Sequence, residues 1–475
     1  MPCAYRESFM IIQPKFFEKH DGAFSFGTNN VAKVHKTLAN ATLTELWENF
    51  CLGASKIALD GTDELAIRIG DCDAPSLDEH AFAINITESG ICAVAKDEKF
   101  LTNAYMTLLQ MIKPICAEEG KELFEIPCAL VRETPDINVR MVHFCVFPET
   151  TLIYLKRFVR LCAALKYTHI IIEFWGTYRY KCLKELGWKE AFTYEQIKPI
   201  INEARDMGLE PIPMFQHLGH ASASRMAMGK HVVLDQNPRL ATLFDEDGWT
   251  WDITKSEVKS LLREARHELY ELFGGGEFIH IGCDEAYIYS KETERNYYLI
   301  DYLNEITAEV FAEGRRPIMW GDMLLCRADI DNQPGYSANA PSPEIAKMLR
   351  EKLDRRMIIA DWHYDVFTAP FLSAKFFNEL GFDTLICPWE KGKNIAAGVE
   401  TAKDAYGFML TTWHTLSANM HTPGLAGAHI WQKKDEKLPT FISSQIAALL
   451  RKLFPINGSY TDAGWAENQI DFLWI

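Results

Sequence analysis

The stretch Glu277-Phe-Ile-His-Ile-Gly-Cys-Asp-Glu-Ala286 predicts a buried strand that ends in two adjacent carboxylates. Residues 278–282 are mostly apolar, His280 lies among them, and Asp284 and Glu285 follow at once. In a parallel β/α protein the C-terminal ends of the strands form the ligand site. Two carboxylates there suit general acid and base chemistry, because like charges a few ångströms apart raise the pKa of one of them. A salt-bridged pair at a strand end is also compatible with this spacing.

Length and composition set the broad class of protein. The chain has 475 residues, which allows two or three domains, and 48% of them are hydrophobic, which is ordinary globular composition. The net charge of −16 argues against a nucleic-acid partner, which would favour a basic face. The N-terminus lacks a basic segment followed by an apolar run, and no run of about 18 apolar residues is present. We therefore expect a soluble, cytoplasmic protein with no membrane segment.

The twelve cysteines are scattered and form no CxxC pair. Several lie within apolar strands or helices, among them Cys145, Cys162 and Cys387. This pattern predicts buried free thiols in a reducing compartment.

Residues 1–130 predict a small, non-catalytic α+β domain. Short strand-like runs occur at 64–69, 81–87 and 91–95, and Thr87-Glu-Ser-Gly90 predicts a hairpin turn, because Gly90 can adopt a positive φ. Apolar residues at helical spacing then follow over 97–111.

Residues 131–420 predict a (β/α)8 TIM barrel, so the fold class is α/β. Eight apolar runs alternate with helix-length amphipathic segments, and this alternation is typical of that barrel. A doubly wound sheet is the alternative, but it usually has fewer strands and a glycine-rich phosphate loop, which this chain lacks. The eight apolar runs of the predicted barrel are 139–145, 170–174, 211–215, 278–282, 318–320, 357–360, 384–387 and 408–412.

Residues 421–475 predict a C-terminal helical segment that packs on the barrel.

Five of the eight predicted strand ends carry a tryptophan: Trp175, Trp320, Trp362, Trp389 and Trp413. Five indoles at one mouth would form an aromatic wall, on which the apolar faces of sugar rings pack. Carboxylates within such a wall indicate glycoside hydrolysis. The rival interpretation is a metal-dependent barrel hydrolase with His217, His220 and an acidic residue as ligands, although no third histidine has matching spacing.

The motifs also resemble a known family. His280-Ile-Gly-Cys-Asp-Glu285 resembles the H-x-G-x-D-E motif of glycoside hydrolase family 20, the β-N-acetylhexosaminidases. Leu218-Gly-His220 resembles the family's P-G-H motif, and Trp320-Gly-Asp-Met323 its tryptophan-containing strand five. Residues 83–91 and 104–110 resemble the α+β domain that precedes the barrel in that family.

The resemblance implies a substrate-assisted reaction in which the acetamido oxygen of the sugar is the nucleophile. Glu285 would be the general acid, and Asp284 would hold the acetamido N–H and stabilise the oxazolinium ion. Arg140 would grip two sugar hydroxyls at the floor of the pocket, which would make the enzyme exo-acting. The resemblance also implies further site residues. His220 and Glu173 would belong to the network behind Glu285. Trp320, Trp362 and Trp413 would wall the sugar pocket, and Tyr364 would bind the acetamido oxygen.

The sequence departs from the family pattern at several of these places. Glu173 and Gln216 stand where other acidic residues are usual, Met141-Val-His-Phe144 replaces an acidic continuation after Arg140, and the acetamido-binding tyrosine has no secure match. We expect an exo-acting β-N-acetylhexosaminidase that takes glycans or glycoconjugates ending in an N-acetylhexosamine, needs no cofactor or metal, and could form a homodimer. A non-catalytic amino-sugar-binding barrel and the metal-dependent hydrolase are the alternatives.

Overall fold

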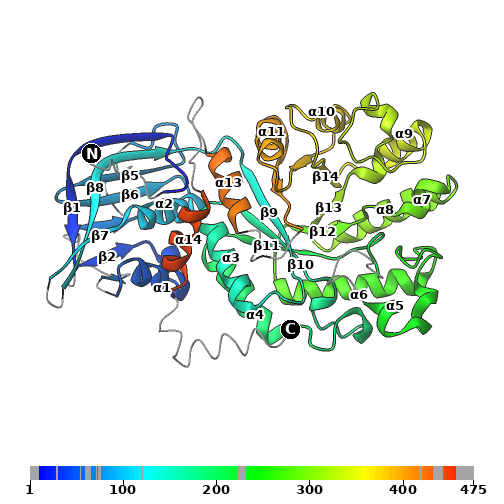
Figure 1. Ribbon diagram of the computed structural model, residues 1–475, viewed down its shortest axis with the longest axis horizontal. Helices are drawn as coiled ribbons and strands as arrows, with labels where there is room; N and C mark the ends of the chain where they lie inside the picture. The colour runs from blue at the N-terminus through cyan, green and yellow to red at the C-terminus, as the bar shows by residue number, and fades with distance from the viewer. Residues whose placement is uncertain are drawn as a thin grey trace.

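A computed structural model describes residues 10–27, 30–53, 55–58, 66–70, 72, 76–118, 121–222, 232–413, 416, 420–431 and 442–455. Its strands form two separate sheets, one in the N-terminal part of the chain and one closed into a barrel (Figure 1).

The N-terminal sheet has eight strands in the order β1-β8-β5-β6-β4-β2-β3, with β7 also paired to β8. Strands β2, β3, β4 and β6 run parallel, whereas β5 is antiparallel to both β6 and β8. The predicted turn is present, because Thr87 of β5 pairs with Gly90 of β6. The bounds are β1 (Phe16–Phe26), β2 (Val31–Val34), β3 (Lys56–Ala58), β4 (Ile67–Ile69), β5 (Phe82–Thr87), β6 (Gly90–Ala95), β7 (Lys113–Glu118) and β8 (Lys121–Glu133).

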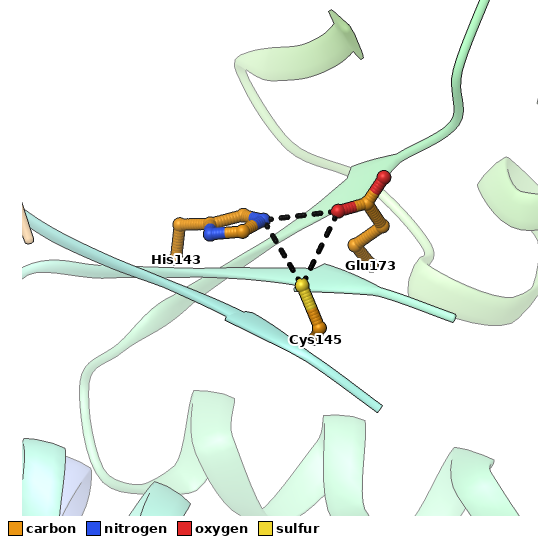
Figure 2. A group of neighbouring side chains, drawn as sticks. All are labelled: His143, Cys145 and Glu173. Carbon is orange, nitrogen blue, oxygen red and sulfur yellow. Dashed lines mark hydrogen bonds and ion pairs between the residues drawn. The ribbon is translucent and has the colours of Figure 1, made fainter. Parts of the chain in front are cut away.

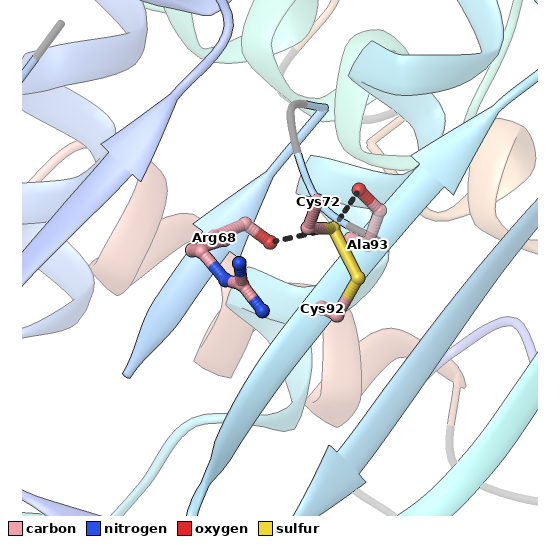
Figure 3. The surroundings of a disulfide bond; sticks show 4 residues. All are labelled: Arg68, Cys72, Cys92 and Ala93. Atoms are coloured by element: carbon pink, nitrogen blue, oxygen red, sulfur yellow. Dashed lines mark hydrogen bonds between the residues drawn. A yellow bond between two sulfur atoms is a disulfide. The ribbon is translucent and has the colours of Figure 1, made fainter. Parts of the chain in front are cut away.

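A disulfide links Cys72, just after β4, to Cys92 in β6 (Figure 3). The two strands pair in parallel, with Arg68 opposite Cys92, so residues 20 apart in the sequence become neighbours. The prediction of free thiols throughout is therefore wrong for this pair. It is correct for Cys145, Cys162 and Cys387, which are buried and unbridged.

The second sheet is a closed barrel of eight parallel strands, which confirms the predicted fold class. Each predicted apolar run contains one strand or overlaps it, because strands covered on both faces need continuous apolar sequence. Side chains from alternate strands, including Met141, Ile212 and Trp320, fill the interior. The bounds are β9 (Val139–Cys145), β10 (His169–Glu173), β11 (Glu210–Met214), β12 (Phe278–Gly282), β13 (Arg316–Trp320), β14 (Ile358–Trp362), β15 (Thr384–Cys387) and β16 (Gly407–Leu410).

The helices surround the barrel or pack on the N-terminal sheet. Within the described ranges, every helix is too short or too polar to cross a membrane. The bounds are α1 (Ala41–Phe50), α2 (Glu98–Met111), α3 (Leu152–Ala164), α4 (Tyr194–Asp206), α5 (Val233–Gln236), α6 (Ser256–Phe273), α7 (Tyr287–Lys291), α8 (Arg295–Ala312), α9 (Pro343–Lys352), α10 (Leu372–Glu379), α11 (Gly392–Ala402), α13 (His421–Ile430) and α14 (Ile442–Leu453).

The two units meet along α2, α3 and α14. Helix α14, red in Figure 1, contacts α1 of the N-terminal unit and α3 of the barrel. The buried Arg160 of α3 binds Glu45 of α1, Glu203 of α4 and, through a 2.7 Å hydrogen bond, the carbonyl of Leu453. Helix α13 contacts α11, and α14 contacts α3 of the barrel. Residues 432–441 and 456–475 of the predicted C-terminal segment lie outside the described residues.

Candidate active site

The backbone after β12 is held in an uncommon conformation. Gly282, Cys283 and Glu285 all have positive φ, at 68°, 72° and 47°. A Cβ on Gly282 would lie 1.8 Å from Gln216 Oε1, so only glycine fits there. Left-handed backbone at a non-glycine residue costs free energy and persists where the surrounding structure enforces it, often at functional sites. This turn directs the side chains of Asp284 and Glu285 towards the loop after β11.

Asp284 and Glu285 converge on one imidazole nitrogen. His220 Nε2 lies 3.1 Å from Asp284 Oδ2 and 3.1 Å from Glu285 Oε2. The loop after β11 approaches closely because of Gly219, where a Cβ would lie 2.0 Å from the Asp284 carbonyl oxygen. The Asp284 side chain is 8% exposed and that of Glu285 is 28% exposed. Glu285 is thus the carboxylate that a ligand can reach more easily.

Two aromatic residues that carried no signal in the sequence, Trp249 and Tyr287, flank Glu285. Trp249 donates a 2.9 Å hydrogen bond to the Glu285 carbonyl, and its ring stacks on Tyr287 at 6.4 Å. The pKa of Tyr287 is raised, mainly by burial and further by the Glu285 carboxylate. Trp249 belongs to the long connection between β11 and α6, so its position could not be inferred from a strand end.

Asp322, after β13, is a third carboxyl group in this cluster. Its Oδ2 accepts from the Glu285 backbone N–H at 3.0 Å and from Asn339 Nδ2 at 2.7 Å, and its Oδ1 accepts from Trp362 Nε1 at 3.1 Å. Burial, followed by the nearby charge of Asp284, raises the pKa of Asp322 to about 7. Asp322 therefore anchors the strained Glu285 backbone and titrates near neutral pH. Asn339 carried no signal in the sequence.

The aromatic side chains at the strand ends form a connected wall. Trp413 stacks on Trp175 with ring centroids 6.5 Å apart and lies 5.7 Å from Trp320. Trp413 Nε1 donates to the Tyr364 hydroxyl at 2.7 Å, and Tyr364 contacts both Trp362 and Trp389. The five tryptophans do converge on one mouth, as their placement at strand ends predicts.

Glu173 and His143 lie beneath this wall, fully buried. His143 Nε2 is 3.2 Å from Glu173 Oε2, and Gln216 Nε2 donates to Glu173 Oε1 at 2.9 Å. Burial alone would raise the pKa of Glu173, but the hydrogen bonds and charges of its neighbours, His143 above all, hold it below its usual range. Glu173 is therefore an ionised carboxylate at the floor of the mouth.

Arg140 does not reach the mouth, so the predicted grip on the sugar is wrong. It is the second residue of β9, at the opposite end of the strand from Cys145. Its guanidinium donates to the carbonyls of Ile137, Asn138 and Lys166 at 2.8–3.0 Å and lies over the Trp431 ring. A guanidinium held this way at the bottom of the barrel is structural.

His217 and His220, the two histidines of the metal-dependent interpretation, also have different neighbours in the structure. His217 is fully buried, its Nδ1 lies 2.7 Å from the Phe215 carbonyl, and burial lowers its pKa to about 3. His220 instead faces Asp284 and Glu285. Among the described residues, two other groups have metal-ligand geometry: His220 with Asp284 and Glu285, and His143 with Cys145 and Glu173.

A parallel barrel with a carboxylate pair inside a tryptophan wall is typical of barrel enzymes that act on sugars. Comparison with known proteins agrees. Residues 172–362 match the glycosyl hydrolase family 20 catalytic domain. The chain thus carries a family 20 catalytic domain and is distantly homologous to the β-hexosaminidases.

Three relatives illustrate the distance. The chain is 28% identical to hexosaminidase D of Bos taurus over 185 residues, which is 36% of this chain and 51% of that protein. It is 22% identical to a β-hexosaminidase of Vibrio furnissii over 331 residues, which is 58% of this chain and 48% of that protein. The chain thus spans about half the length of the curated relatives it matches. The fold is shared with a family 20 exo-β-N-acetylglucosaminidase of Vibrio harveyi in complex with N-acetylglucosamine, at a TM-score of 0.70 and 16% identity over 96% of this chain and 79% of that one.

Proposed function

We propose that this protein is an exo-acting β-N-acetylhexosaminidase that releases terminal β-linked GlcNAc or GalNAc with retention of configuration. The observation that carries the proposal is the convergence of Asp284 and Glu285 on His220 within the tryptophan wall. Arg140 lends no support to exo action, which rests on the family relationship alone. The partner would be a glycan or glycoconjugate that ends in an N-acetylhexosamine, and the setting would be the cytoplasm.

In the proposed reaction the acetamido oxygen of the substrate attacks the anomeric carbon. Glu285 protonates the leaving oxygen and later removes a proton from the attacking water. Its position suits this task, because it is the more exposed carboxylate and its backbone is fixed by Asp322. His220 hydrogen-bonds its carboxylate and positions it.

Asp284 would orient the acetamido group and stabilise the positive charge of the oxazolinium ion. Its Oδ1 is buried and has no hydrogen-bond partner among the described residues, so an acetamido N–H would supply the missing donor. The Tyr364 oxygen accepts from Trp413, and its own proton would be donated to the acetamido oxygen. Trp320, Trp362 and Trp413 would hold the acetamido group against the anomeric carbon.

The test compares the p-nitrophenyl β-glycosides of GlcNAc, GalNAc and glucose. We expect turnover of at least one acetamido sugar and none of the glucoside, which lacks the nucleophile. Glu285→Gln should lower kcat by about 10²–10⁴-fold and Asp284→Asn by roughly 10²–10³-fold. Glu294→Gln, an exposed carboxylate replaced in the same way, is the matched control and should keep full activity.

Two results would overturn the proposal. Equal cleavage of the glucoside would require a nucleophile from the protein. Near-normal turnover by folded Glu285→Gln would show that Glu285 is not the general acid. Binding of a GlcNAc-terminated glycan without turnover would instead support the amino-sugar-binding alternative. Release of di- and trisaccharides from chitohexaose before any monosaccharide would contradict exo action while leaving the chemistry intact.

A further inference from the structure

A second group of chemically reactive side chains lies at the floor of the mouth, apart from the Asp284 and Glu285 pair. His143 and Cys145 come from the C-terminal half of β9, and Glu173 ends β10 (Figure 2). All three side chains are fully buried. Two adjacent parallel strands bring them together, because His143 pairs with Ile171 and Cys145 pairs with Glu173.

Their three donor atoms face a common point. His143 Nε2 is 3.2 Å from Glu173 Oε2 and 3.9 Å from Cys145 Sγ, and the sulfur is 3.4 Å from Glu173 Oε2. Three atoms at these separations lie on a circle of about 2.0 Å radius. Zinc binds nitrogen and oxygen at roughly 2.0–2.2 Å and sulfur at about 2.3 Å. An ion slightly out of their plane would therefore reach all three with little movement of any side chain.

The arrangement differs from a nucleophile relay. In a cysteine–histidine–carboxylate triad the imidazole uses one nitrogen for the thiol and the other for the carboxylate. Here the thiol and the carboxylate both approach Nε2 of His143, as Figure 2 shows. Three ligand atoms that converge in this way form one side of a metal-coordination site and not a proton relay.

The surrounding residues orient the carboxylate for coordination. Glu173 Oε1 accepts hydrogen bonds from Trp175 Nε1 and Gln216 Nε2, which turns Oε2 towards His143 and Cys145. Ligand carboxylates in metal sites are commonly held by such outer hydrogen bonds. The His143 ring is fixed by Trp413, 4.6 Å away, and by Trp320 at 5.7 Å.

We propose that His143, Cys145 and Glu173 form a binding site for one divalent cation of the zinc class, beneath the aromatic wall. One nitrogen, one sulfur and one carboxylate oxygen suit Zn²⁺ or Co²⁺, whereas Mg²⁺ and Ca²⁺ favour oxygen donors alone. Binding replaces the thiol proton, which is released, so that a dication balances one thiolate and one carboxylate in a buried place. The bound ion would tie the end of β9 to that of β10 and so hold Trp175 and Trp413 in position.

The test uses the full chain, treated with chelator and then loaded with Co²⁺. We expect one ion per chain and an absorption band from thiolate-to-cobalt charge transfer. Cys145→Ser should abolish the band and weaken binding by at least about 100-fold, since changes to outer-shell partners alone cost 10–100-fold. Cys387→Ser is the matched control, because Cys387 is also a buried, unbridged thiol at the end of a barrel strand, and its band should be unchanged.

The charge-transfer band separates this site from His220 with Asp284 and Glu285, which contains no sulfur. Zinc-edge X-ray absorption of the wild-type protein gives a reading that needs no variant, and it should show one sulfur ligand among nitrogen and oxygen ligands. Absence of stoichiometric binding, a zinc environment without sulfur, or a cobalt band that survives Cys145→Ser would overturn the proposal. Loss of glycosidase activity plays no part in these readouts, so the outcome does not depend on the proposed function.

Discussion

Replacing Arg140 by methionine should destabilise the protein and leave its active site intact. The guanidinium is fully buried, and its pKa is lowered to about 9 because burial disfavours the charge. It is held by three carbonyl oxygens, those of Ile137, Asn138 and Lys166. Methionine fills similar space against Trp431 but donates no hydrogen bond.

The size of the effect follows from those three contacts. The carbonyls of Ile137 and Lys166 are buried, and each would cost about 1–3 kcal/mol if left without a donor, whereas the partly buried carbonyl of Asn138 would cost less. Relief of the buried charge offsets part of the sum. We expect a net loss of about 4 kcal/mol. For a chain of 475 residues the unfolding entropy is roughly 1 kcal/mol per kelvin, so the midpoint of thermal unfolding should fall by about 4 °C.

The assay pairs calorimetry with kcat/KM on the acetamido glycoside, measured well below the unfolding midpoint. Folded Arg140→Met should retain kcat/KM within about threefold. Trp413→Phe is the opposite case, because it removes the hydrogen bond to Tyr364 at the mouth, and it should lower kcat/KM by about tenfold or more. A 100-fold loss of kcat/KM in Arg140→Met with an unchanged midpoint would refute the placement of Arg140 at the bottom of the barrel.

Two further predictions concern stability. Because the pKa of Asp322 is raised to about 7, the folded chain holds a proton that the unfolded chain releases near pH 4. Asp322 should therefore lower the unfolding free energy by roughly 2–3 kcal/mol as the pH rises from 5 to 7. Urea titrations at several pH values should show this loss in the wild type and not in Asp322→Asn. The same dependence of the unfolding free energy on pH in both proteins would contradict the prediction. Cys72→Ser should lower the unfolding free energy by about 3 kcal/mol and abolish its response to reductant, since the Cys72–Cys92 bridge closes a loop of 20 residues. Cys128→Ser, at a buried free thiol, keeps the bridge and should respond to reductant as the wild type does. Equal reductant sensitivity of wild type and Cys72→Ser would argue against the bridge.

The sequence was sufficient for the architecture and the central carboxylates. Strands buried on both faces need continuous apolar runs, so the run at 278–282 and its seven counterparts marked the barrel strands. A residue that follows such a run lies at the C-terminal mouth, which is why Asp284, Glu285 and the five tryptophans could be placed together. These inferences use only local periodicity and chain direction.

Tertiary structure decided everything that depends on pairing and on long loops. Arg140 follows the start of β9 and not its end, so its guanidinium meets the carbonyls below the barrel. The register of β4 against β6 brings Cys72 to Cys92, and loop packing brings Trp249 and Asn339 to Glu285 and Asp322. No local pattern encodes these contacts, because they depend on where distant segments fold back. The sequence by itself thus determined which end of the barrel carries the chemistry, and the packing of the chain determined which side chains reach it.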